Sequence, residues 1–150
     1  MGLIIPVTWG IGVGETKTDA YARALSDAGI EKLNFQYLNI YHPSQIELPT
    51  GVDVSFDRSP CAYKAGDIVT CFSAQTDGDE PFQEYAVGMA HIRLSDRALL
   101  VKGEGTSEEA VRRALEQAAR VYGKLLEDLP YRITTKNREQ YTAVLMVALL

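Results

Sequence analysis

Apolar runs at the two ends of the chain predict buried strands. Residues 3–9 form a short, β-branched run, and residues 140–150 are apolar on both strand faces after Tyr141. Neither run approaches the roughly 20 apolar residues that a membrane helix needs. A strand that is apolar on both faces must be covered on both sides. We therefore expect both faces of the C-terminal strand to be covered by other elements.

Two segments have the 3.6-residue hydrophobic period of helices that bury one side. The first begins at Thr16, which with Asp19 resembles a capping box, and continues until a glycine ends the apolar repeat. The second has a capping box formed by Thr106 and Glu109 and extends to about Glu127. The pattern predicts one helix soon after the first strand and a longer one ahead of the C-terminal strand.

Four further strands are predicted between these helices, at residues 32–40, 67–75, 83–92 and 98–104. Turn-forming residues separate the last three, which favours an antiparallel meander. Residues 41–60 form an irregular connection with one short strand at 52–56. This order predicts a single α/β domain over residues 1–150, in which helices cover a mostly antiparallel sheet with a second sheet packed behind it.

The glycine-rich stretch GIGVGETKT, residues 10–18, resembles a phosphate-binding loop, because glycines expose backbone N–H groups ahead of a helix. The frame that ends in Lys17 and Thr18 lacks the glycines that a nucleotide-binding loop requires, and no frame completes G-x-G-x-x-G. The stretch therefore predicts a tight strand-to-helix turn that binds no nucleotide.

Composition and charge exclude several classes of function. The net charge of −5 and the lack of a basic stripe argue against a nucleic-acid partner, since phosphate binding needs clustered lysine and arginine. The two cysteines lack CxxC spacing and the two histidines lack a partner at helical spacing, so no metal is expected. The first residues lack the features of a signal peptide. A cytoplasmic protein without a membrane partner is the expectation.

Functional groups gather at the end of the predicted strand 32–40, in the stretch NFQYLNIYHPS. Tyr37, Asn39, Tyr41 and His42 form a polar and aromatic set there. Such a set suits proton transfer, with His42 as a shuttle. It suits the binding of a small polar molecule equally well.

The stretch ALLVKGEG, residues 98–105, places Lys102 and Glu104 two residues apart, and therefore on one face of a strand. The neighbouring glycines leave room for a ligand. A lysine removed from water could act as a base or form a Schiff base, while the glutamate shuttles protons. The alternative is an exposed ion pair at a strand end, which has little energetic weight.

The stretch GETKTDAYARALSDAGIEKLNFQYLNIYHP is similar to the N-terminal region of pyruvoyl-dependent arginine decarboxylases, which carry a Gly-Glu-Thr start, an Ala-Leu-x-x-Ala-Gly-Ile helix end and an asparagine-bearing strand in this order. Three later stretches, KAGDIVTCFSAQT, YAVGMA and GEGTSEEAVRRALEQAARVYGKLLE, resemble two strands and a long helix of the same family. The resemblance spans most of the chain and is strongest over residues 10–43. It implies an αββα sandwich with mostly antiparallel sheets, assembled as a homotrimer with active sites between subunits.

The same resemblance implies where the chain departs from the family. In the family, the hydroxyl of a serine attacks the preceding carbonyl group, and the chain is cleaved there. The serine becomes a pyruvoyl cofactor, which forms a Schiff base with the substrate amine. That serine falls on Ile40, which has no hydroxyl group. The family's catalytic glutamate falls on Lys102, and an acidic residue that recognises substrate falls on Ala22. Asn34, which supports cleavage in the family, and Glu104, a second acidic position, are retained.

We therefore expect a small-molecule enzyme, trimeric and suited to a biosynthetic pathway, that uses this scaffold without pyruvoyl or another cofactor. Its chemistry would be acid/base or lysine-amine chemistry in an inter-subunit cleft. The expected catalytic residues are Lys102, His42 and Glu104, and the expected substrate-binding residues are Asn34, Tyr37, Asn39 and Tyr41. Two alternatives stay open: an inactive homologue that binds a ligand or a partner subunit, and an arginine decarboxylase with an unrecognised processing site.

Overall fold

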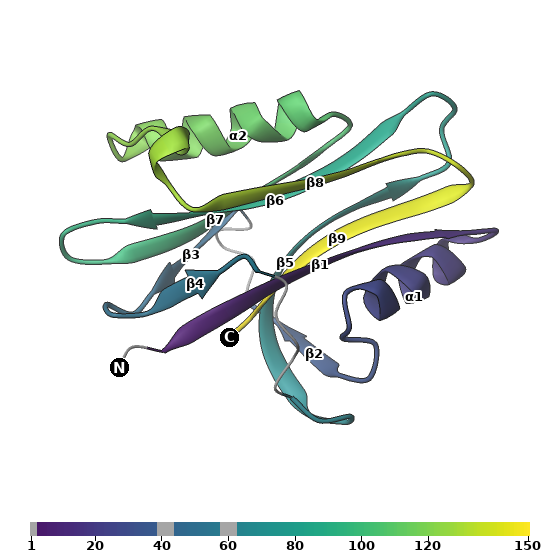
Figure 1. Ribbon diagram of the computed structural model, residues 1–150, viewed down its shortest axis with the longest axis horizontal. Helices are drawn as coiled ribbons and strands as arrows, with labels where there is room; N and C mark the ends of the chain where they lie inside the picture. The colour runs from purple at the N-terminus through teal and green to yellow at the C-terminus, as the bar shows by residue number, and fades with distance from the viewer. Residues whose placement is uncertain (1–2, 39–43, 58–62) are drawn as a thin grey trace.

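The computed structural model describes residues 3–38, 44–57 and 63–150, which form four layers with a helix on each outside and two β-sheets between them (Figure 1). The helices are α1 (Lys17–Asp27), α2 (Glu108–Val121) and the short 3-10 helix η1 (Leu126–Asp128). The strands are β1 (Ile4–Gly14), β2 (Asn34–Tyr37), β3 (Gln45–Leu48), β4 (Asp53–Ser55), β5 (Ile68–Gly78), β6 (Glu84–Arg93), β7 (Ala98–Gly105), β8 (Tyr131–Asn137) and β9 (Tyr141–Leu149). This arrangement confirms the expected αββα sandwich.

The two sheets are mostly antiparallel, as expected. The five-stranded sheet has the order β2-β5-β9-β1-β4, and the four-stranded sheet has the order β3-β7-β6-β8. Only the outer pairs of the larger sheet, β1 with β4 and β2 with β5, are parallel among the described strands. The larger sheet carries α1 on its outer face, and the smaller sheet carries α2 (Figure 1).

β9 has both faces covered, as its continuous apolar sequence predicts. One face contributes to the central cluster between the two sheets, through Val144, Met146 and Ala148. The other face packs under α1, through Ala143, Leu145, Val147 and Leu149. A third cluster fills the space between α2 and the four-stranded sheet. Burial of these three clusters stabilises the four layers as one unit.

β1 continues through the glycine-rich stretch, so the predicted tight turn there is wrong. Gly10, Gly12 and Gly14 alternate along β1 and therefore lie on one face of it, opposite α1. A Cβ atom on Gly12 would lie 1.9 Å from the carbonyl oxygen of Ala20, and one on Gly10 would lie 2.0 Å from that of Ala24. The glycines let the α1 backbone approach the strand closely, which is their physical role here.

α2 is shorter than the sequence pattern predicts. Ser107, and not Thr106, is the N-cap, because its hydroxyl accepts a hydrogen bond from the Ala110 N–H at 3.0 Å. The helix ends before Gly123, whose φ of +73° favours glycine, and not near residue 127. The N-cap of α1 is the one predicted. Within the described ranges, no helix is long and apolar enough to cross a membrane.

Two strands that the hydrophobic pattern did not reveal complete the four-stranded sheet. β3 lies in the segment predicted to be an irregular connection, and β8 lies between α2 and β9. The short strand predicted at 52–56 is confirmed as β4. The predicted meander is wrong, because β5 belongs to the five-stranded sheet whereas β6 and β7 pair in the other. The chain therefore crosses between the sheets after β5.

Candidate functional site

Lys102 and Glu104 lie at the edge of the space between the two sheets. Side chains of β7 alternate in direction, and the face that carries these two residues also carries Ala98 and Leu100 of the central cluster. Lys102 Nζ lies 2.9 Å from Glu104 Oε1. The Lys102 side chain is 19% exposed and that of Glu104 is 37% exposed. The fold brings these two predicted residues together, with the ammonium group the less exposed of the pair.

Lys102 also links the two sheets. Its Nζ donates a hydrogen bond to the carbonyl oxygen of Ser73 on β5 at 2.7 Å, and it lies 5.5 Å from the ring centroid of Phe72. A carbonyl and a carboxylate are both acceptors, and each holds one N–H of the ammonium group in place. An ammonium has three N–H donors. Two of them have partners among the described residues, so the ammonium group can still donate a third hydrogen bond, for example to an anion.

The residues that border the segment 39–43 are hydrogen-bonded to the strands of this site. The Leu38 N–H donates to the carbonyl oxygen of Cys71 at 3.0 Å, and Cys71 is two residues from Ser73 on β5. The Lys102 N–H donates to the carbonyl oxygen of Ser44 at 2.9 Å. Three predicted site residues belong to this segment and lie outside the described residues: Asn39, Tyr41 and His42.

Asn34 and Tyr37 lie on β2, and their side chains do not join Lys102. Asn34 Nδ2 donates to the carbonyl oxygen of Gly66 at 3.0 Å, which ties the start of β2 to a loop. The Tyr37 hydroxyl lies 3.1 Å from the Tyr21 hydroxyl of α1, so Tyr37 is on the outer face of the sheet. Burial and the hydrogen bond to Tyr21 raise the pKa of Tyr37 above its ordinary value. A protonated phenol on the outer face is a separate feature from the Lys102 site.

Sequence reasoning missed His91, a buried imidazole between the two sheets. His91 is 1% exposed, and neither of its ring nitrogens has a hydrogen-bond partner among the residues that the structure describes. It alternates on β6 with Met89 of the central cluster, which places its ring on the same face. Burial lowers the pKa of His91, because the charged form loses its hydration. The sequence carries no signal for this position, since a lone histidine in an apolar strand resembles any other core residue.

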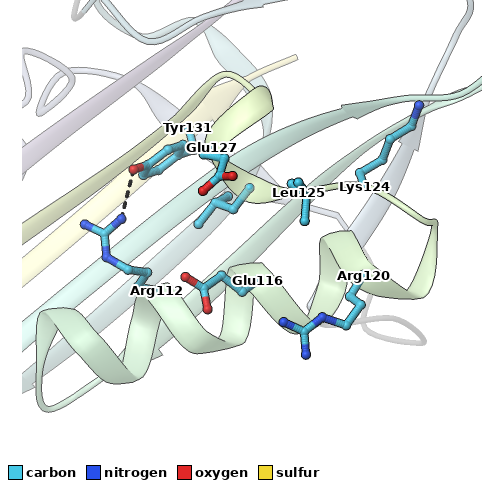
Figure 2. A pocket seen from close by; sticks show the side chains of 8 residues that line it. Arg112, Glu116, Arg120, Lys124, Leu125, Glu127 and Tyr131 are labelled. Carbon is cyan, nitrogen blue, oxygen red and sulfur yellow. Dashed lines mark hydrogen bonds between the residues drawn. The ribbon is translucent and has the colours of Figure 1, made fainter.

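A hollow of about 230 Å³ between α2 and the segment that leads from it to β8 is lined by charged side chains, and none of the predicted site residues that the structure describes lines it (Figure 2). It is lined by Arg112, Glu116, Arg120, Lys124, Leu125, Leu126, Glu127 and Tyr131. Arg112 is already engaged, since it donates to the Tyr131 hydroxyl at 2.9 Å and to Glu108 at 3.1 Å. The lining combines positive and negative side chains, and Arg112 is already paired within the protein. The hollow therefore indicates no particular class of ligand. Among the described residues, no three histidine, cysteine or acidic side chains are grouped to hold a metal ion.

A known protein family matches almost the whole chain. The model of the family described as "Pyruvoyl-dependent arginine decarboxylase (PvlArgDC)" matches residues 4–150, a range that includes both Lys102 and Glu104. No curated protein matches the sequence.

Proposed function

Because the chain belongs to the pyruvoyl-dependent arginine decarboxylase family, we propose that it is a lyase-type small-molecule enzyme that uses this scaffold without forming pyruvoyl. The observation that carries the proposal is the ion pair of Lys102 and Glu104 beside the central core, with the ammonium held 2.7 Å from the carbonyl oxygen of Ser73. A fixed proton donor next to a more exposed carboxylate supplies the two groups that acid/base catalysis needs.

The residues present do not fit a pyruvoyl group. Its formation needs a serine hydroxyl at the cleaved bond, and Ile40 stands at the position that resembles the family's serine. The nearest serine downstream, Ser44, follows a proline, and its carbonyl accepts a hydrogen bond from the Lys102 N–H. By the same resemblance, the Lys102 ammonium group stands where the family has a catalytic glutamate. The proposed reaction therefore uses side chains alone.

Abstraction of a proton next to a carbonyl group is the reaction that this geometry suits best. The Glu104 carboxylate, 37% exposed, takes the proton from carbon. The Lys102 ammonium donates a hydrogen bond to the substrate oxygen on which negative charge develops, and the proton then returns to a carbon or leaves with the product. Lysine-amine chemistry is less favoured, because a Schiff base would leave at most one N–H on Nζ for its two present acceptors.

Lys102→Met is expected to abolish proton exchange at carbon. The wild-type protein is incubated in D₂O with a panel of 2-oxo acids, 2-amino acids and neutral ketones, and exchange of the C–H next to the carbonyl is followed by NMR. Loss of a positioned acid or base costs on the order of 10²–10⁴ in rate. Lys136→Met is the matched control, because Lys136 on β8 forms its own ion pair, with Glu139 in the turn that follows. Equal rates in all three proteins, or no exchange by the wild type on any member of the panel, would refute the proposed chemistry.

Intact mass separates this proposal from processing. The unprocessed chain has a mass of 16.5 kDa, and a single species at that value is expected. Two fragments, one with a blocked N-terminus, would instead show an arginine decarboxylase with an unrecognised cleavage site. All three proteins of the exchange assay are weighed first, so that a processed fraction cannot account for their activity.

The site is proposed to be completed by neighbouring copies of the chain, in a homotrimer. Ile68 alternates on β5 with Phe72 of the central cluster, yet Ile68 is 76% exposed. On this face, the larger sheet therefore extends beyond the area that the smaller sheet covers. The uncovered part lies near the Lys102 side chain, which contacts Phe72. Leu38 and Tyr63 add further exposed apolar surface, at 40% and 37%. A second copy is the occupant that the oligomeric state of this family supports.

Ile68→Asp is expected to convert the trimer to monomers, because it places an unpaired charge in an apolar interface. Sedimentation velocity measures the change in mass. Phe82→Asp is the matched control, because Phe82 is fully exposed at the turn between β5 and β6 and is expected to leave the trimer intact. A wild-type monomer, or a trimer in the Ile68 variant, would contradict this assembly.

A further inference from the structure

The two charges of the site differ in how strongly they can hold a ligand. The Lys102 side chain is 19% exposed and fixed by a backbone carbonyl of β5, whereas Glu104 is 37% exposed and is held, among the described residues, only by Lys102. A less hydrated, positionally fixed charge forms the stronger ionic hydrogen bond. A charged ligand can bind here by displacing one member of the ion pair. It therefore binds more strongly to the ammonium than to the carboxylate.

We infer that the site binds small molecules through a carboxylate group, which takes the place of Glu104 on the Lys102 ammonium. This inference rests on the proposed function, because it concerns the same side chains. The Glu104 carboxylate itself shows the required geometry, with an oxygen 2.9 Å from Nζ. A small amine carries the same charge as the Lys102 ammonium and is repelled by it. To bind Glu104, the amine would have to displace that ammonium.

The exchange of partners also connects binding to the proposed chemistry. Once a substrate carboxylate accepts the hydrogen bond from Lys102, the Glu104 side chain loses its partner and is a free base beside the ligand. The Ser73 carbonyl keeps the ammonium in position, at 2.7 Å, while this happens. The class of substrate that fits both steps is a 2-oxo acid or another carboxylic acid with an acidic C–H next to its carbonyl carbon.

Butyrate, n-butylamine and butyramide test the inference, since they share a carbon chain and differ in charge. They are titrated into the full-length protein, and binding is followed by NMR shifts of the lysine side-chain methylene groups. Wild-type protein is expected to bind butyrate at least about tenfold more tightly than butylamine. Glu104→Gln is expected to bind butyrate more tightly still, because the internal competitor is neutralised, and Lys102→Met is expected to lose butyrate binding. Lys136→Met is the control that keeps it.

The outcomes distinguish this inference from the proposed function. Preference for butylamine, or butyrate affinity that does not change in Lys102→Met, would overturn the carboxylate inference whatever the exchange assay gives. Butyrate binding that depends on Lys102, together with no proton exchange on any acid, would support the binding site and refute the enzyme. A Glu104→Gln protein that binds none of the three probes would show that the pair has only a structural role.

Discussion

Replacing Gly12 by alanine is expected to lower the free energy of unfolding by about 3 kcal/mol or more, the upper part of the range for overpacked cores. The added Cβ would lie 1.9 Å from the carbonyl oxygen of Ala20 and 2.4 Å from the backbone nitrogen of Ala24. Both atoms belong to the α1 backbone, so no side-chain rotation can relieve the contact. The whole helix has to move away from β1, which opens the apolar cluster beneath it.

Urea unfolding of the variant and of Gly105→Ala provides the measurement. Gly105 also lies on a strand that faces a helix, but a Cβ there would be 3.5 Å from the Ala110 Cβ, an ordinary contact. The control is expected to stay within about 1 kcal/mol of wild type. In Gly14→Ala, the added Cβ would lie 2.6 Å from the Asp19 Cβ, and the stability of this variant is expected to fall between those of the other two. It replaces the Gly12 variant in the comparison if that variant does not fold. Equal stability of all three variants would show that α1 does not depend on this close approach.

The glycine row shows where the hydrophobic pattern reaches its limit. Glycine at every second position, as in Gly10, Gly12 and Gly14, is equally compatible with a flexible turn and with a flat strand face. Only the partner decides between them, and here the partner is the row of small residues Ala20, Ala24 and Ala28 on α1. The spacing of two fits the alternation of a strand but does not by itself exclude a turn.

The candidate site was predictable in part. The adjacency of Lys102 and Glu104 follows from strand alternation alone, which is a local rule. The carbonyl that fixes the ammonium belongs to Ser73, 29 residues away on the other sheet, and no sequence pattern identifies a backbone acceptor at that distance. Tyr37 was grouped with this site because it precedes the same strand end, but the packing of α1 on β2 determines which face it occupies. Strand alternation predicts which side chains of one strand share a face. The packing of helices and sheets determines which of these side chains lie in the same site.

Acid is expected to destabilise the protein through His91, and His91→Leu is expected to remove that sensitivity. Burial holds the folded-state pKa of His91 below the ordinary 6.5, so the unfolded chain binds the proton more readily. By linkage, this contribution to stability is complete above pH 6.5 and is lost as the pH falls toward the folded-state pKa. Protonation would also add a charge to the face of β6 that carries Arg93, whose guanidinium group pairs with Asp53.

Chemical unfolding at a series of pH values from 7.5 downward measures the effect as a difference between wild type and variant. At pH 7.5, His91→Leu is expected to raise the free energy of unfolding by about 1–3 kcal/mol, because it removes two buried nitrogens that have no partner in the described part of the chain. The gain should increase as the pH falls. Thr134→Val is the matched control, since the Thr134 hydroxyl is also buried, has no partner within the described ranges and does not titrate. Its gain should be the same at every pH. A constant difference for both variants would mean that the His91 imidazole is hydrated or hydrogen-bonded in solution, and that its burial between the sheets does not govern acid stability.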